Sequence, residues 1–468
     1  MTGEDDVAYA SAVSLLQLYR KRALSPVEVA RFLLDRLDAL QPRINAFCIV
    51  DREGALAAAR ESEERWQRGE VVGRLDGVPV TIKDLLLMRG FPTLRGSRLV
   101  DPDQDWSEDA PATARSREAG AIILGKTTTP EFGWKAVGDS PLTGITRNPW
   151  DLSRTPGGSS AGAAAACAAG IGPLHVGSDG AGSIRIPSAF TGVFGLKPSF
   201  GRVPAYPSSP MGLLSHVGPI ARTVADAALM LTVLSGADHR DPYALPPEDR
   251  NYFDGLDGGI RGWRVAYSPT LGYAKVGPEI AASTLDAAGR FEALGAIVEE
   301  VDAIFASPRD ALLTLWAAGA AKLLAAFPSE RKALIDPGLV ATAAEGERIS
   351  AVDYLGADLV RTSLGQQMAA FHRKYDLLLT PMMPIPALPV GQDLNEPATE
   401  RHWIDWSPFS YPFNLTRQPA AGIPCGLTSN GLPIGLQIVG PLYADDRVLR
   451  AARAFETTQP ERRPQLAP

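Results

Sequence analysis

The first 70 residues space their apolar side chains as amphipathic helices do. Three helices are expected there, over residues 11–22, 25–39 and 51–69. The second is the best defined, because Ser25-Pro26-Val27-Glu28 matches a capping box with proline at the first helical position. We therefore expect residues 1–70 to form a helical segment that packs on a core made by residues 71–468.

Beyond residue 70 the pattern changes to short apolar runs that are typical of buried strands. The first such run is Gly77–Asp84. Further strands are expected at 121–124, 263–267 and 296–301, and helices at 110–119, 223–234 and 278–294. This alternation predicts an α/β fold, with a β-α-β unit over 263–301. The turn sequence Ser429-Asn430-Gly431 lies between two apolar runs, 422–427 and 435–439, and predicts a hairpin.

Residues 385–408 cannot be assigned to a helix or a strand from their pattern. They combine several prolines with Trp403 and Trp406 and show no clear period. Two interpretations stay open, a Pro-rich surface excursion or a lid over a binding site. The length of 468 residues suggests about three domains at ~150 residues each.

Composition narrows the class of protein. The chain is 45% apolar and 21% charged, with a net charge of −7, so it is globular rather than disordered. The acidic balance argues against a nucleic-acid partner. Three widely spaced cysteines suggest neither a disulfide framework nor a metal site. The acidic start and the lack of a strongly apolar run of ~20 residues predict a cytoplasmic protein without a membrane partner.

The candidate functional residues lie mainly in a glycine- and serine-rich stretch, residues 155–198. The run Gly180-Ala181-Gly182-Ser183 can turn several backbone N–H groups toward one point, which suits a phosphate or an oxyanion. A phosphate loop is disfavoured, because the chain lacks GxxxxGK[ST]. The run Gly158–Gly162 matches the nucleophile elbow GxSxG, but no apolar strand precedes it and no histidine stands in a suggestive context. A plainer interpretation is that Ser159 and Ser160 cap the Ala-rich helix that follows.

Taken whole, residues 155–198 resemble the signature of the amidase signature family, serine hydrolases with a Ser–cis-Ser–Lys triad. The resemblance extends over about residues 10–455. It includes the segments 77–84, 125–133, 414–424 and 431–437. It implies one large α/β/α domain with a mixed, twisted central sheet, in place of the three domains that the length suggests.

The resemblance implies a role for each matching residue. Ser183 would be the nucleophile, Ser159 the bridging serine held by a cis peptide bond, and Lys83 the base. A solvated lysine amine, with a pKa of about 10.4, is protonated at neutral pH. Burial in the apolar context of Val80 and Ile82 would lower the pKa of Lys83 and make it a base. No metal or organic cofactor is implied.

The neighbouring residues complete the expected site. The N–H groups of Gly180, Ala181, Gly182 and Ser183 would form the oxyanion hole. The residues expected to support the active loop are Asp179, Arg185 and Ser160. The sequence departs from the family pattern at Ala161 and Ala181, where glycine is usual, and at Thr128, where asparagine is frequent. A methyl group at residue 181 removes free access to positive φ.

The resemblance implies hydrolysis of a small amide, with a carbamate or ester as further substrates. Ile186 stands where the A subunit of the glutamine-dependent tRNA amidotransferase typically has glutamine, and is expected to line the approach with hydrocarbon. That subunit and a catalytically idle scaffold stay as alternatives. A homodimer is left open. The variable spacers between motifs are expected to supply the pocket walls, at residues 130–145, 203–216, 310–320 and 400–412.

Overall fold

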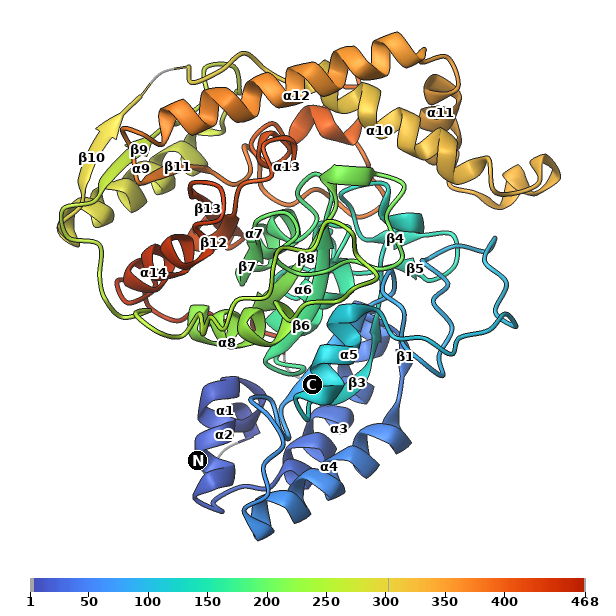
Figure 1. The fold of residues 1–468 in the computed structure, drawn as a ribbon, viewed down its shortest axis with the longest axis vertical. Helices are drawn as coiled ribbons and strands as arrows, with labels where there is room; N and C mark the ends of the chain where they lie inside the picture. The colour runs from blue at the N-terminus through green and yellow to red at the C-terminus, as the bar shows by residue number, and fades with distance from the viewer. Residues whose placement is uncertain (1–3, 302, 467–468) are drawn as a thin grey trace.

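A computed structural model describes residues 4–301 and 303–466, and Figure 1 shows their arrangement. Within these residues, eleven strands form one sheet in the order β1-β3-β2-β6-β8-β7-β12-β13-β11-β9-β10. The pairs β3–β2, β2–β6, β11–β9 and β9–β10 are parallel, and the other neighbours are antiparallel. The predicted mixed sheet is therefore confirmed, and it runs through the whole molecule.

The strands of this sheet are β1 (Phe47–Val50), β2 (Pro79–Lys83), β3 (Ile122–Thr127), β6 (Leu174–Asp179), β7 (Phe194–Lys197), β8 (His216–Ala221), β9 (Arg264–Tyr267), β10 (Ile297–Glu300), β11 (Leu377–Pro381), β12 (Ala420–Leu427) and β13 (Pro433–Val439). A separate pair is formed by β4 (Asp139–Ser140) and β5 (Gly144–Ile145).

The α-helices are α1 (Glu4–Ala8), α2 (Ala12–Arg20), α3 (Pro26–Ile44), α4 (Arg52–Arg68), α5 (Pro111–Glu118), α6 (Ala161–Ala168), α7 (Arg185–Thr191), α8 (Val224–Leu234), α9 (Pro278–Ala293), α10 (Arg309–Leu324), α11 (Pro337–Gly346), α12 (Ala351–Phe371), α13 (Pro412–Leu415) and α14 (Asp445–Glu456). Short 3₁₀ turns are η1 (Glu131–Gly133), η2 (Gly212–Leu214), η3 (Ser329–Leu334) and η4 (Trp403–Trp406).

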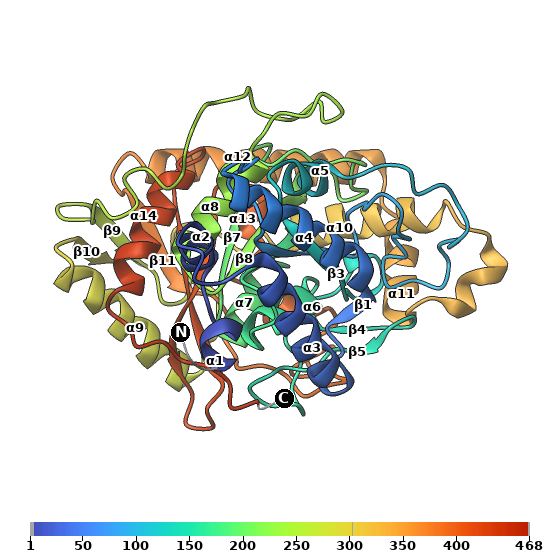
Figure 2. The ribbon, with the colours of Figure 1, turned by 90° about the horizontal axis from the view of Figure 1, so that it is seen from below.

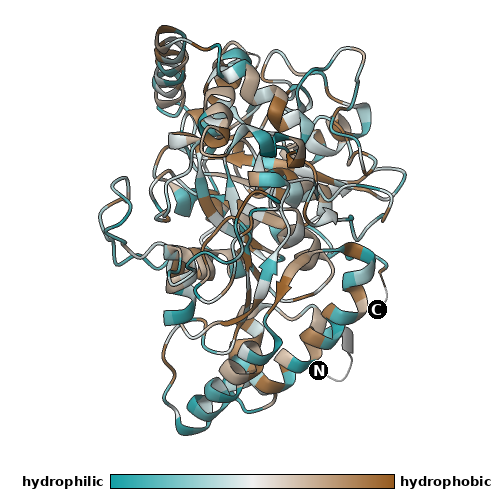
Figure 3. Ribbon diagram, turned by 90° about the vertical axis from the view of Figure 1, so that its right-hand side faces the viewer, coloured by the Kyte–Doolittle hydropathy of each residue, from teal (hydrophilic) through white to brown (hydrophobic). Residues whose placement is uncertain are grey.

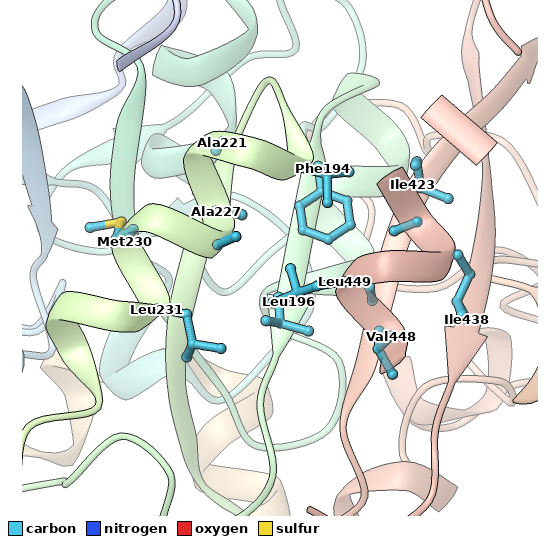
Figure 4. Packing of buried hydrophobic residues seen from close by; sticks show 14 of the residues in the cluster. Phe194, Leu196, Ala221, Ala227, Met230, Leu231, Ile423, Ile438, Val448 and Leu449 are labelled. Carbon is cyan, nitrogen blue, oxygen red and sulfur yellow. The ribbon is translucent and has the colours of Figure 1, made fainter. Parts of the chain in front are cut away.

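The sheet is covered on both faces because its strands are apolar on both sides. In β11, Leu377 and Leu379 join one core while Leu378 joins the other, as the two-residue period of a strand requires. Helices α8, α9 and α14 cover the first face, where the residues of β7, β8, β12 and β13 pack against α8 and α14 (Figure 4). Helices α7 and α10–α13 cover the second face. Figure 3 shows hydrophobic segments gathered along the sheet and hydrophilic ones on the outer loops.

The three helices expected in the N-terminal segment are present as α2, α3 and α4. The capping box of α3 is present, with Ser25 Oγ accepting from Glu28 N–H and Glu28 accepting from Ser25 N–H. Helix α3 continues past the expected end to Ile44. The strand β1, between α3 and α4, pairs with β3 and was not expected. The described N- and C-terminal segments approach each other beside these helices (Figures 1 and 2), where the guanidinium of Arg463 is 4.4 Å from the ring centre of Tyr9.

The predicted β-α-β unit and the hairpin are confirmed. Strands β9 and β10 are parallel and joined through α9, and β12 pairs antiparallel with β13 across the turn at Gly431. Helices α10–α12, at the top of Figure 1, were not expected. In the Pro-rich region, Trp403 and Trp406 are buried, whereas most of 391–402 is partly or fully exposed. In the described chain, every helix is too short or too polar to span a bilayer.

Candidate active site

Two neighbouring strands place the expected catalytic residues at one edge. Strands β2 and β6 run parallel, so Lys83 at the end of β2 lies beside Ser178 and Asp179 at the end of β6. The segment before α6 brings Ser159 to the same point, and the turn between β6 and α7 carries Ser183. The fold therefore brings the three expected catalytic residues into one region.

Lys83 is completely buried among hydroxyl groups. Its Nζ lies 2.7 Å from Ser159 Oγ, 3.0 Å from Ser160 Oγ and 3.0 Å from Ser178 Oγ. Burial lowers the pKa of Lys83 well below 10.5, and the negative charge of Asp179 opposes this only in part. A neutral amine at this position can accept the proton of Ser159. Ser178 was not among the expected residues.

Ser160 has a different role from the one that a cap would have. It stands at the N-cap position of α6 but caps no helix N–H group with its side chain. Its hydroxyl instead donates to Ser178 C=O at 3.1 Å and faces Lys83. The capping interpretation is therefore wrong for Ser160, because the buried amine and carbonyl compete for the hydroxyl. The peptide bond between Gly158 and Ser159 is cis.

Ser183 joins this cluster through the backbone. Ser160 N–H donates to Ser183 C=O at 3.1 Å, and Ser183 is buried with 4% of its surface exposed. Among the hydrogen bonds of the described residues, none joins the hydroxyls of Ser183 and Ser159. The positive φ of the loop falls on Gly182, at 127°, and Ala181 keeps a negative φ. The methyl group of Ala181 is thus accommodated without left-handed backbone.

A buried carboxylate shapes the loop that carries Ser183. Asp179 accepts from Gly182 N–H at 2.7 Å and from Ile184 N–H at 3.1 Å, and it pairs with Arg185 at 3.0 Å. Although burial opposes it, the charge of Arg185 holds the pKa of Asp179 below its usual value. The Gly182 N–H is therefore engaged and is withdrawn from the expected oxyanion hole. Gly180, Ala181 and Ser183 remain as the expected donors.

Arg185 is anchored by residues from the far end of the chain. Its guanidinium donates to Ser410 C=O at 2.8 Å, to Asn414 Oδ1 at 2.6 Å and to Gln437 Oε1 at 2.7 Å. The sequence resemblance includes the segments around residues 414 and 437 but implies no role for them. Only the fold shows that they hold the active loop.

A cavity of about 300 Å³ opens beside the serine cluster. Ser178 forms part of its wall, and its apolar lining comes from Leu85, Phe132, Phe200, Val203, Tyr206 and Leu323. The expected walls at 130–145 and 203–216 contribute to it, whereas none of its lining residues comes from 310–320 or 400–412. Ile186 is fully buried against Gly182 and is not among the lining residues, so the expectation that it lines the approach is wrong.

Arg95 and His216 are among the polar side chains that line this cavity. Arg95 lines it, and burial lowers the pKa of its guanidinium. His216 lines it as well; its Nδ1 lies 2.9 Å from Leu214 C=O, and burial lowers its pKa well below 6.5, so the ring is neutral. Within the described residues, no group of three His, Cys, Asp or Glu side chains is placed to hold a metal ion.

Comparison with known proteins defines the class. A bacterial aryl acylamidase of the amidase signature enzymes superimposes with a TM-score of 0.91 at 32% identity, covering 97% of this chain and 96% of that one. An acylamidase of Rhodococcus erythropolis is 39% identical over 98% of this chain and 97% of its own length. The A subunit of the glutamyl-tRNA(Gln) amidotransferase of Acidothermus cellulolyticus is 36% identical, covering 98% and 96%.

Residues 28–449 match the model of the Amidase family, and the chain belongs to that family. It is an amidase, a hydrolase of carbon–nitrogen bonds other than peptide bonds. The α/β fold and the family expected from the sequence are thereby confirmed.

Proposed function

We propose that Ser183 cleaves a small amide through an acyl-enzyme. Its Oγ bonds to the carbonyl carbon while its proton passes to Ser159, and the proton of Ser159 passes to Lys83. The carbonyl electron pair moves onto oxygen, where the N–H groups of Gly180, Ala181 and Ser183 would stabilise it.

The same relay then runs in reverse. The carbon–nitrogen bond breaks, and the leaving nitrogen takes the proton held by Lys83 through Ser159. Water attacks the acyl carbon and gives a proton to the relay. The bond to Ser183 Oγ then breaks, Ser183 takes that proton back through Ser159, and the acid is released. One observation carries this proposal: a fully buried Lys83 amine lies 2.7 Å from Ser159 Oγ, so a neutral base touches the bridging hydroxyl.

The cavity supports an aryl or alkyl amide as the substrate. Phe132, Phe200 and Tyr206 offer an apolar and aromatic wall next to Ser178. Similarity to an acylamidase and to an aryl acylamidase supports the same class. Carbamates and esters would pass through the same acyl-enzyme. Similarity to amidotransferase A subunits supports glutamine hydrolysis for a partner subunit as the second candidate.

Labelling with a fluorophosphonate tests the nucleophile. We expect wild-type protein to be labelled and Ser183→Ala to be unlabelled. Ser160→Ala is the matched control and should still be labelled, because its hydroxyl is hydrogen-bonded to Lys83 and to the backbone of Ser178 and takes no part in the proposed attack. Labelling that persists in Ser183→Ala but is lost in Ser160→Ala would favour the GxSxG elbow instead. No labelling of any form would favour the idle scaffold.

A hydrolysis panel tests the substrate. Chromogenic anilides, primary amides, carbamates, esters and glutamine are compared at equal concentration. We expect anilides or alkyl amides to give the highest kcat/KM. Robust glutaminase activity that depends on added partner subunits would contradict a stand-alone amidase. A cytoplasmic location and a homodimer stay predictions, to be checked by cell fractionation and by sedimentation.

A further inference from the structure

A second cavity, of about 500 Å³, lies between α12 and the segment that follows α13. It shares no lining residue with the cavity beside the serines. Its wall includes Arg361 and His372 from α12 and its C-terminal end, and Thr416, Arg417 and Gln418 from the segment that leads into β12.

Four buried polar atoms on this wall have no hydrogen-bond partner among the described residues. They are Arg361 Nε, His372 Nε2, Thr416 Oγ1 and Gln418 Oε1. Thr416 and Gln418 are only 5% and 3% exposed. Buried polar atoms are normally paired, so a group of them around one cavity points to a polar occupant.

Hydrogen bonds behind the wall fix what each of these atoms can do. His372 Nδ1 lies 3.0 Å from Tyr375 C=O, which places the ring proton on Nδ1 and leaves Nε2 as an acceptor. Burial lowers the pKa of His372 to about 4, so the ring is neutral at pH 7. Gln418 Nε2 donates to Gly440 C=O at 2.8 Å, so its Oε1 is the free acceptor. Arg361 Nε is a donor, and the Thr416 hydroxyl can donate.

The charge of the wall is positive. Arg361 is paired with Asp358 at 2.6 Å, whereas Arg417 forms no ion pair with a described carboxylate and lies 5.9 Å from the ring centre of Phe200. No acidic side chain is among the lining residues. Arg417 also has a φ of 64°, in the left-handed region that non-glycine residues rarely adopt. The guanidiniums of Arg361 and Arg417 together outweigh the single carboxylate of Asp358, so the cavity favours the binding of an anion.

We propose that this cavity binds a small hydroxylated organic anion, a carboxylate or a phosphate ester. Its anionic oxygens accept from Arg361, Arg417 and Thr416. Its hydroxyl groups donate to His372 Nε2 and Gln418 Oε1.

The site is joined to the catalytic loop by α13, which makes the ligand an effector of hydrolysis. Asn414 in this helix donates to Asp179 Oδ1 at 2.9 Å, two residues before Thr416. Arg417 lies over Phe200, whose ring meets His216 edge-on at 5.5 Å. Phe200 and His216 both line the cavity beside the serines.

Titration calorimetry of the full chain tests the binding, with no need for hydrolysis. The probes are citrate, glycerol 3-phosphate and inorganic phosphate, with uncharged glycerol as the control. We expect one of the two organic anions to bind and glycerol not to. Preference for citrate or for glycerol 3-phosphate distinguishes a carboxylate from a phosphate ester. The absence of heat with every anion at millimolar concentration would overturn the proposal.

Three variants locate the site. Arg417→Gln and Thr416→Val should each weaken binding at least tenfold. Arg373→Gln, exposed next to His372 and outside the cavity wall, removes the same charge and should bind as wild type does. An equal loss in Arg373→Gln would show non-specific attraction to surface charge. A crystal structure grown with the bound probe, with only water in this cavity, would also overturn the site.

Kinetics test the effector role separately. At saturating anion we expect kcat or KM for the best amide to change at least twofold, and no change in Arg417→Gln. Binding that leaves both constants unchanged would overturn the effector role.

Discussion

An amine inside a protein is normally paired with a carboxylate, because an ammonium loses its hydration there. Lys83 has three hydroxyl neighbours instead, and Asp179, whose negative charge acts on it, is itself paired with Arg185. The same burial that makes the charged form unfavourable makes the neutral base available. At the scale of one residue, the basicity of Lys83 is a consequence of its removal from solvent.

The pH dependence of hydrolysis follows from this. Lys83 works only when neutral, and its pKa lies well below 10.5. We expect kcat/KM to be retained at neutral pH and to fall as the pH drops through that lowered pKa. Initial rates between pH 4 and pH 10 measure the profile. An activity that rises only near pH 10 would show that Lys83 stays protonated in the folded enzyme. Lys83→Met should lose activity at every pH.

Gly182 is a second residue whose position does not tolerate a side chain. An added Cβ would lie 2.6 Å from Ser410 Cβ and 2.7 Å from Ile186 Cδ1, at a φ of 127°. We expect Gly182→Ala to lower kcat/KM by about 100-fold or more, since ~1 Å of misplacement has that effect. Gly431→Ala is the control, because its φ is also positive, at 78°, but its Cβ would meet nothing within 4 Å. Similar losses in both variants would contradict a local steric cause.

At the scale of elements, α13 has more influence than its four residues suggest. Asn414 accepts from Arg185 and donates to Asp179 Oδ1, Asp179 C=O and Leu214 C=O. We expect Asn414→Leu to destabilise the fold by ~1–3 kcal/mol, because several buried groups lose their partner. Urea unfolding measures this. Asn430→Leu, in the exposed hairpin turn, should change stability far less. Equal effects would show that α13 has no special role.

How well an element can be predicted depends on whether its signal is local. The capping box at Ser25 and the turn at Gly431 are set by a few neighbouring residues, and both were predicted. Strand β1 is only four residues long and forms because β3 presents a free edge to it. Helix α12 keeps a broad exposed face that includes Leu355 and Leu359, so its hydrophobic period gives little signal.

The same distinction applies to the site. The family motifs predicted Lys83, Ser159 and Ser183 as site residues. The fold brings all three to the edge of the sheet where β2 and β6 end. The partners of Arg185 could not be predicted, because hydrogen bonds across more than 200 residues leave no local pattern. The engagement of the Gly182 N–H could not be predicted either, because its hydrogen bond to Asp179 depends on how the folded loop turns.

For the whole molecule, a buried neutral lysine links stability to pH. Burial lowers the pKa of Lys83 in the folded protein, whereas in the unfolded chain the amine binds a proton below a pKa of about 10.4. The unfolded state therefore binds more protons, and the free energy of unfolding should rise with pH between the folded and the unfolded pKa. The contribution is ~1.4 kcal/mol per pH unit for one group.

Urea unfolding at pH 7, 8 and 9 checks this. We expect the free energy of unfolding of Lys83→Met to rise less steeply with pH than that of the wild type. Ser183→Ala, which should also be inactive, should keep the wild-type slope. Lys197 is also buried with a lowered pKa, so some slope should remain in both variants. An identical slope in wild type and Lys83→Met would show that Lys83 is charged in the folded state.

The anchoring of Arg185 has a consequence for how the enzyme is made. Its acceptors Ser410, Asn414 and Gln437 are 225, 229 and 252 residues downstream. A growing polypeptide contains all three proposed catalytic side chains when residue 183 leaves the ribosome. It does not yet contain the residues that hold Arg185. We therefore expect Ser183 to be unreactive through most of synthesis. Stalled chains that end before residue 410 should not react with fluorophosphonate, whereas released full-length chains should react.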